Sequence, residues 1–411
     1  MSAYAQRRHV RSLRLAAVPL APLLALALAL ALVPSAAVRA DGGAPNLAYV
    51  VGGGSGGGDL TVIDIAKRKV TGHVTIGGDP ASVLLSADGR YAYIPQTAKN
   101  QVAVVDTRTL SVTATMAAGP APKAVVIGFT ANAPLLYVAD SGGNTVTVLN
   151  PDTRRAVATI PVGVQPSGLA IAGLGSGIRE TNPNDAEIYV ANTGSDTVSV
   201  ISTERRAVIA TIPAPGGPVG VVIPSAGGVA YVSTRTGTVL GISIIDHTLL
   251  GTLLQLHGQP GQMDYDAITG EVYVPDPAAG VVDVLAPVAA GDPGQPATLP
   301  PQPERAMAFA GGPAAVAITF DGALGFVAER DAGRVAMLDV GARQTLTTIT
   351  VGGAPHAIIT GAYPPALDQN TANIIIYIVV AIFLAAAAYA IYITIRRNRR
   401  LSASKNTEHT P

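Results

Sequence analysis

The chain alternates short apolar runs with small polar turns along most of its length. In residues 136–150, LYVADSGGNTVTVLN, two such runs flank a turn of Asp, Ser, Gly and Asn, and closely similar segments occur at 91–106 and 188–202. Apolar and β-branched residues that alternate with polar ones, bounded by Gly, Asn, Asp and Pro, are typical of short β-strands joined by turns. The pattern therefore predicts a β-hairpin that the chain repeats many times.

Two markers give the period of this repeat. An aromatic residue stands in the first strand of each hairpin, and a Gly-rich turn that ends in Pro follows each hairpin. The aromatic residues are Tyr49, Tyr93, Tyr137, Tyr189, Tyr231, Tyr273 and Phe326, and the prolines are Pro80, Pro122, Pro166, Pro218, Pro260, Pro313 and Pro355. Both markers occur seven times, at spacings of 42–53 residues.

Each period contains four apolar runs, of which the first follows the Pro and the second carries the aromatic residue. A period of about 42 residues with four strands is the signature of a β-propeller blade. A sandwich or a barrel would explain the strands but not the regular period. The sequence therefore predicts an all-β fold, a seven-bladed β-propeller over residues 41–363.

The order of runs at the two ends predicts how the ring closes. The repeats open with an aromatic-headed run, LAYVV, and end with a single Pro-headed run, PHAIITGAY, at 355–363. Three strands from the start and one from the end would complete one composite blade. This 3+1 closure would leave no open sheet edge between the first and last blades.

Two repeats are longer than the others because of Pro- and Gly-rich insertions. Residues 173–185 separate the first and second strands of one blade, and residues 286–305 precede the last strand of another. Such segments are expected to be exposed loops. They are either tolerated surface insertions or loops that contact a partner, and the sequence leaves both readings open.

Both ends of the chain carry membrane signals. Residues 1–40 combine a basic start, a Leu- and Ala-rich stretch and a small-residue site at 38–40, which predicts a signal peptide, with an uncleaved anchor as the alternative. Residues 374–395 are uncharged and long enough for a transmembrane helix, and RRNRR follows them. The positive-inside rule then places a tail, 396–411, in the cytoplasm and the propeller outside, joined by a linker at 364–373.

Charge and cysteine content exclude some functions. The whole chain has 27 basic and 27 acidic residues, but residues 41–368 have 17 basic and 26 acidic ones. A negative propeller would repel phosphate backbones, so nucleic acid is not an expected partner. The chain has no Cys, which excludes disulfides and thiolate chemistry.

The repeat resembles that of the YVTN-family β-propellers, whose pattern is roughly Tyr-Val-x-Asn, then Thr-Val-Ser-Val-Ile-Asp, then a Gly-x-x-Pro turn. The segment IYVANTGSDTVSVIS at 188–202 matches it almost letter for letter, and the resemblance covers most of the predicted ring. The resemblance implies the fold, but not a function, because such propellers include surface-layer-type proteins, and related propellers include lactonases, a lyase and haem-binding domains.

The mouth of the central channel, formed by the Gly-x-x-Pro turns, is the expected place for a ligand. The residue two after each Pro is small in six of the seven turns, as expected where strands converge; the exception is Gln262. Polar residues around these turns are the candidate ligand-binding residues. They are Asp79, Lys123, Gln165, Ser167, Gln259, Gln262 and His356, with His257 and Asp264 close by in the sequence.

These residues do not make up a known catalytic set. His356 and His257 could bind a metal or act as bases, but they lie in non-adjacent repeats, and no third imidazole occurs at an equivalent turn. No Glu lies in the set to act with either of them. No catalytic residue, metal site or cofactor is therefore predicted.

The sequence predicts a single-pass membrane protein whose propeller acts outside the cytoplasm as a non-catalytic binding or scaffold module, with a protein or another cell-envelope component as its partner. The alternative is an enzyme or carrier of the lactonase, lyase or haem-binding type that uses the channel mouth. A third possibility is a cell-envelope coat protein.

Overall fold

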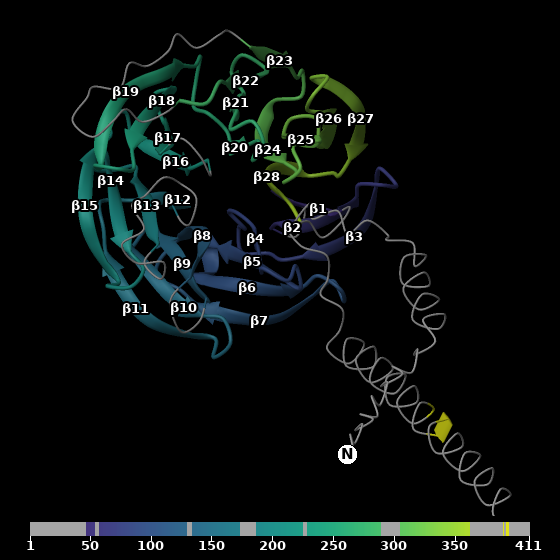
Figure 1. Ribbon diagram of the computed structural model, residues 1–411, viewed down its shortest axis with the longest axis horizontal. Helices are drawn as coiled ribbons and strands as arrows, with labels where there is room; N and C mark the ends of the chain where they lie inside the picture. Colours follow the sequence, from purple (N-terminus) through teal and green to yellow (C-terminus); the bar gives the residue numbers. More distant parts are fainter. Residues whose placement is uncertain are drawn as a thin grey trace, which may run out of the picture. The chain divides into compact units, whose positions relative to one another are not determined.

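The computed structural model describes residues 47–53, 57–129, 134–172, 186–224, 228–288 and 305–361, together with Tyr389, Tyr392 and Ile393. Within these residues seven four-stranded antiparallel sheets, the blades, follow one another around a ring (Figure 1). The predicted all-β seven-bladed propeller is confirmed.

Blade 1 contains β28 (Ala354–Thr360), β1 (Leu47–Gly53), β2 (Asp59–Asp64) and β3 (Lys69–Thr75). Blade 2 contains β4 (Leu84–Leu85), β5 (Tyr91–Gln96), β6 (Gln101–Asp106) and β7 (Ser111–Ala117), with a short 3-10 helix, η1 (Thr97–Lys99), between β5 and β6. Blade 3 contains β8 (Pro122–Phe129), β9 (Pro134–Asp140), β10 (Thr145–Asn150) and β11 (Arg155–Pro161). Blade 4 contains β12 (Pro166–Ala172), β13 (Glu187–Asn192), β14 (Thr197–Ser202) and β15 (Ala207–Pro213).

Blade 5 contains β16 (Pro218–Val222), β17 (Val229–Thr234), β18 (Thr238–Ser243) and β19 (Thr248–Gln255). Blade 6 contains β20 (Asp264–Tyr265), β21 (Val272–Asp276), β22 (Val281–Leu285) and β23 (Ala306–Ala308). Blade 7 contains β24 (Pro313–Ile318), β25 (Leu324–Glu329), β26 (Arg334–Asp339) and β27 (Gln344–Thr350). In every blade the first strand is innermost and the fourth is outermost.

Blade 1 closes the ring with strands from both ends of the propeller. Its innermost strand, β28, pairs antiparallel with β1, so that Val50 lies opposite Ile358. Beyond the last paired residues, the N–H of Gly361 donates to the carbonyl of Leu47 at 3.0 Å. The predicted 3+1 closure is confirmed.

The marker aromatic residues form the core between the blades. All seven are at most 6 % exposed. In one core cluster, Tyr189 of blade 4 packs together with Val221 and Val232 of blade 5, so the cluster joins two neighbouring blades. Some of these aromatic residues also bond across blades: the Tyr137 hydroxyl donates to the Thr203 carbonyl at 3.3 Å. The repeated tyrosine thus fixes one blade against the next.

Some buried polar residues of the repeat join the segment before a blade's Pro to its sheet. Three positions after the aromatic residue, six blades place a buried polar residue. These residues are Gln96, Asp140, Asn192, Thr234, Asp276 and Glu329. Asp140 accepts a hydrogen bond from the N–H of Gly119 at 2.9 Å, and Gln96 donates to the carbonyl of Ile76 at 2.9 Å. In these two blades the polar residue therefore links the segment before the Pro to the sheet.

Strand direction gives the ring two distinct faces. Because neighbouring strands are antiparallel, the second-to-third and fourth-to-first turns lie at one face, here called the mouth face. The first-to-second and third-to-fourth turns lie at the other face. It is here called the exit face, because the chain enters the ring there at Leu47 and leaves it there at Gly361. Both insertions leave from the exit face, between β12 and β13 and between β22 and β23, although 173–185 and 289–304 lie outside the described residues.

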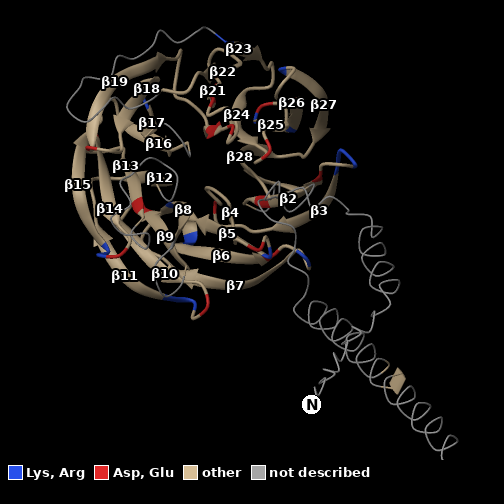
Figure 2. Ribbon diagram, viewed as in Figure 1, with Lys and Arg blue, Asp and Glu red and all other residues tan. Residues whose placement is uncertain are grey.

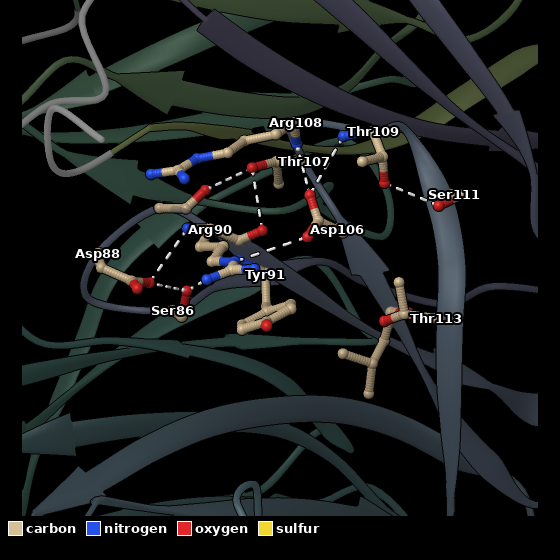
Figure 3. Close-up of polar contacts among 12 residues, drawn as sticks. Ser86, Asp88, Arg90, Tyr91, Asp106, Thr107, Arg108, Thr109, Ser111 and Thr113 are labelled. Atoms are coloured by element: carbon tan, nitrogen blue, oxygen red, sulfur yellow. Dashed lines mark hydrogen bonds and ion pairs between the residues drawn. The ribbon is translucent and has the colours of Figure 1, made fainter. Parts of the chain in front are cut away.

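Polar side chains hold the exit-face turns of blade 2, as Figure 3 shows. One carboxylate oxygen of Asp106 accepts hydrogen bonds from the N–H groups of Arg108 and Thr109, at 2.9 and 3.1 Å. The Thr107 hydroxyl donates to the Arg90 carbonyl at 3.0 Å, which links the third-to-fourth turn to the first-to-second turn. These turns are short and well hydrogen-bonded, so they display their remaining side chains in fixed positions.

The predicted segments outside the ring are not described. The signal peptide at 1–40, the linker at 364–373 and the tail at 396–411 lie outside the described residues, as does all of 374–395 except Tyr389, Tyr392 and Ile393. Among the residues that are described, no helix has the length and apolar character needed to cross a membrane.

Candidate functional site at the channel mouth

A cavity of about 690 Å³ opens at the mouth face, and all seven blades contribute to its lining. The lining consists mainly of the Gly-x-x-Pro turns and the innermost strands that follow them. Residues from the second-to-third hairpins of blades 1, 5 and 7, Gly53, Ser233 and Arg330, complete it.

The structure explains why small residues follow the prolines. A Cβ atom on Gly168 would lie 2.6 Å from the carbonyl oxygen of Val219 in the next blade, and one on Gly220 would lie 2.7 Å from the Ser233 hydroxyl. The contact at Gly168 is with backbone and excludes a side chain there, whereas at Gly220 the Ser233 side chain would have to move. Gly168 therefore lets the innermost strands of blades 4 and 5 approach each other beside the cavity.

Six of the seven candidate residues lie in the cavity lining. They are Asp79, Lys123, Ser167, Gln259, Gln262 and His356. Gln165 does not line the cavity: it is exposed, has a left-handed backbone (φ 54°), and its N–H donates to the Asn144 side chain of the preceding blade at 2.9 Å. Its role is to shape the turn.

His356 makes contacts that join two blades. Its Nε2 lies 2.9 Å from the carbonyl oxygen of Pro80 in the turn that enters blade 2, and its Nδ1 lies 3.1 Å from the carbonyl oxygen of Ala354. In either charge state, carbonyl oxygens occupy both directions in which this ring would bind a metal or a proton donor.

Gln262 and Ser167 are also used for contacts between blades. The side-chain amide of Gln262 donates to the carbonyl of Ile358 at 2.9 Å, which links blade 6 to blade 1 across blade 7. The Ser167 hydroxyl lies 2.7 Å from the Thr193 hydroxyl and 3.1 Å from the Val219 carbonyl of blade 5. Gln262 is large where the other six positions are small because its amide spans this gap.

His257 lies outside the cavity, paired with a buried carboxylate. Its backbone N–H and its Nδ1 are 2.8 and 3.0 Å from Oδ2 of Asp276. Burial alone would raise the pKa of Asp276, but hydrogen bonds from His257 and Ala279 hold that pKa below its usual value. His257 and His356 do not share one site, and the described residues contain no cluster of three or more His, Asp or Glu that could hold a metal ion.

The charged groups that remain available in the lining are Lys123, Arg330 and Asp79. Arg330 was not a sequence candidate because it lies in a hairpin turn rather than beside a Pro. The strand order could have predicted that Arg330 lies near the cavity, because second-to-third turns lie on the same face as the fourth-to-first turns. In addition, the buried Ser82 hydroxyl has no hydrogen-bond partner among the described residues.

Asp264, in the innermost strand of blade 6, has an unusual carboxyl group. Burial raises its pKa from the usual 3.8 to about 6, although the N–H of Ile318 donates to Oδ2 at 2.8 Å and opposes that shift. The folded protein keeps the Asp264 proton up to about pH 6, whereas the unfolded chain releases it near pH 4. The contribution of Asp264 to the free energy of unfolding is therefore largest below pH 4 and is lost as the pH rises from about 4 to about 6.

Replacing Asp264 with Asn should therefore stabilise the protein above pH 6 and leave its stability at pH 4 little changed. The Asn oxygen still accepts from Ile318, and the cost of burying a charge disappears, so the gain at pH 8 should be about 1–3 kcal/mol. Urea unfolding of both proteins between pH 4 and pH 8 measures the difference. Parallel stability curves for the two proteins would show that Asp264 does not titrate with a raised pKa.

Comparison with solved structures supports the fold, whereas the two other comparisons found no match. No family model matches the chain, and no curated protein matches it. Among solved structures, it is similar to a functionally unknown protein from Desulfotomaculum acetoxidans, with 14 % identity over 78 % of this chain and 99 % of that one and a TM-score of 0.59.

A proposed 6-phosphogluconolactonase from Bacteroides fragilis gives a TM-score of 0.59, with 16 % identity over 76 % of this chain and 97 % of that one. Hydrazine synthase from Kuenenia stuttgartiensis gives a TM-score of 0.55, with 20 % identity over 71 % of this chain and 92 % of that one. At these identities the likeness extends to the fold alone: the chain is a seven-bladed β-propeller similar in structure to lactonase-like propellers.

Proposed function

We propose that the protein is a membrane-anchored, extracytoplasmic propeller that binds a negatively charged group of a ligand or partner at the channel mouth, without catalysing a reaction. The observation that carries the proposal is the cavity of about 690 Å³, whose lining includes the cations Lys123 and Arg330 and the single carboxylate Asp79. A carboxylate or phosphate group would gain charge-assisted hydrogen bonds there.

The contacts of the lining residues favour binding over catalysis. General acid–base chemistry needs a group that is free to exchange a proton with the substrate. The His356 ring faces two backbone carbonyls, the Gln262 amide donates to blade 1, and the Ser167 hydroxyl donates to the Val219 carbonyl of blade 5. This leaves two cations and one exposed carboxylate, a set suited to holding an anion.

The place of the protein in the cell is proposed from its sequence. Residues 374–395 supply a membrane anchor, and the RRNRR segment that follows favours a cytoplasmic tail and an external propeller. The repeat pattern supports membership of the YVTN group of propellers. Several of those are surface-layer-type proteins, in keeping with a role at the cell envelope.

Binding of 6-phosphogluconate to the full-length protein, measured by calorimetry, tests this function. The probe carries both a carboxylate and a phosphate, and we expect binding that Lys123→Ala and Arg330→Ala each weaken by about tenfold or more. Lys99→Ala, which removes a lysine outside the cavity lining, should leave the affinity unchanged. An affinity that none of these substitutions alters, or no binding at all, would contradict an anion site at the mouth.

The alternative is an enzyme or carrier of the lactonase, lyase or haem-binding type, and similarity to a proposed 6-phosphogluconolactonase favours testing the lactonase first. Hydrolysis of 6-phosphogluconolactone above the rate in buffer, and its loss in His356→Ala, would replace the binding role with an enzymatic one. Binding of 6-phosphogluconate without such hydrolysis supports the non-catalytic role.

A further inference from the structure

The chain enters and leaves the ring at adjacent points on the exit face. Leu47 and Gly361 are joined by a hydrogen bond of 3.0 Å. Only residues 362–373 separate Gly361 from the apolar segment 374–395. Fully extended, these residues span about 40 Å. An anchor at 374–395 therefore holds the ring near the bilayer by its exit face.

The exit face carries the two most exposed large apolar side chains of the described ring. Ile268 is 70 % exposed and Phe320 is 59 % exposed, whereas the next value, for Val164, is 45 %. Both lie in first-to-second turns, Ile268 between β20 and β21 and Phe320 between β24 and β25. Exposed apolar groups of this size are unfavourable in water, so two together at one face point to an apolar contact.

The two turns lie side by side and are held rigidly. A Cβ atom on Gly322, in the Phe320 turn, would be 2.5 Å from a carboxylate oxygen of Asp266, in the Ile268 turn. The Asp266 carboxylate accepts from the N–H of Ile268 at 2.8 Å, and Gly322 donates to the Thr319 carbonyl at 2.8 Å. Since each turn is fixed by its own hydrogen bonds, both side chains are presented outward together.

The same face carries basic residues suited to lipid phosphates. Six exposed Arg and Lys side chains in or beside the third-to-fourth turns of blades 1, 3 and 4 form no ion pair within the described residues. They are Arg68, Lys69, Arg154, Arg155, Arg205 and Arg206. Figure 2 shows Lys and Arg, with Asp and Glu beside some of them, at the outer rim of the ring, where β3, β11 and β15 begin.

We propose that the exit face lies on the bilayer that holds the anchor. Ile268 and Phe320 enter the headgroup region, and the six basic residues contact lipid phosphates. The combination of apolar tips and basic residues is the one that binds protein surfaces to anionic membranes. This inference rests on the anchor proposed above and adds the orientation of the ring, which points the mouth cavity away from the membrane.

Site-specific labelling of the full-length protein tests the orientation, and the absence of native Cys makes each label unique. Ile268→Cys and Phe320→Cys would each carry the environment-sensitive fluorophore NBD in vesicles of phosphatidylcholine and phosphatidylglycerol. Val164→Cys, at an exposed apolar position on the mouth face, is the matched control. Lipids with a nitroxide near the headgroup should quench the labels at 268 and 320 roughly twofold or more and leave the label at 164 unquenched.

The outcomes separate this inference from the anchor. If the protein floats with the vesicles after a carbonate wash but labels at 268 and 320 are no more quenched than the label at 164, the orientation is wrong and the anchor stands. If the protein does not float with the vesicles, the anchor is wrong and the orientation fails with it. Arg154→Glu combined with Arg155→Glu should reduce quenching at 320 in phosphatidylglycerol vesicles, and Lys99→Glu on the mouth face should not.

Discussion

A chain that ends at residue 353 should show no cooperative unfolding transition, whereas a chain that ends at residue 361 should fold and unfold as one unit. The eight residues between these ends contain β28, the strand that pairs with the inner edge of β1. Without it, Val50 and Val51, now at most 2 % exposed, lose their cover. The ring would then expose an unpaired, apolar sheet edge, which promotes aggregation.

Circular dichroism during heating, together with size-exclusion chromatography, measures this effect. Total stabilities of folded domains are about 5–15 kcal/mol, so the loss of a core strand is comparable with the whole. In the full-length chain, Ile358→Asp should have a similar effect because Ile358 is fully buried, whereas Val157→Asp on the exposed edge of blade 3 should cost little. A cooperative transition for the chain that ends at 353 would show that the ring is stable while open.

Replacing Tyr137 with Ala should destabilise the protein by about 3–5 kcal/mol, the usual cost of removing a buried aromatic side chain. Tyr137 is fully buried, and its cavity could not collapse because the side chain packs in the core shared by blades 3 and 4. Tyr137→Phe keeps the ring, removes the hydrogen bond to the Thr203 carbonyl, and should cost about 0.5–1.5 kcal/mol.

The equivalent position in blade 7 is Phe326, which is fully buried without a hydroxyl. This supports the expectation that the ring, rather than the hydroxyl, supplies most of the stabilisation. Urea unfolding of the two variants gives both values. Equal losses for Phe and Ala would instead assign the stabilisation to the hydrogen bond to Thr203.

The sequence predicted most of the fold because the repeat carries each structural requirement in one residue type. Tyr marks the core between blades, and a small residue after the Pro marks the convergence of innermost strands. The orphan Pro-headed run at the end predicted the 3+1 closure. Regular spacing therefore specified the number, order and direction of the strands.

The site was less predictable because the sequence does not show which polar groups are already used. His356 and Gln262 looked available for ligands, but their partners are backbone carbonyls in other blades, at separations of 276 and 96 residues. Arg330 reaches the cavity through a turn that carries no distinctive motif. Polarity near the mouth could be predicted, whereas the contacts between blades required the structure.

The hydrogen bond between Leu47 and Gly361 makes the starting point of the ring arbitrary. A circular permutant that joins these residues and opens between β12 and β13 would contain the same seven sheets, because circular permutation is tolerated where the chain ends lie close together. The permutant would begin in blade 4, so the anchor would attach three blades away from its present position. The blade that carries the membrane anchor can thus change while the ring of seven blades stays the same.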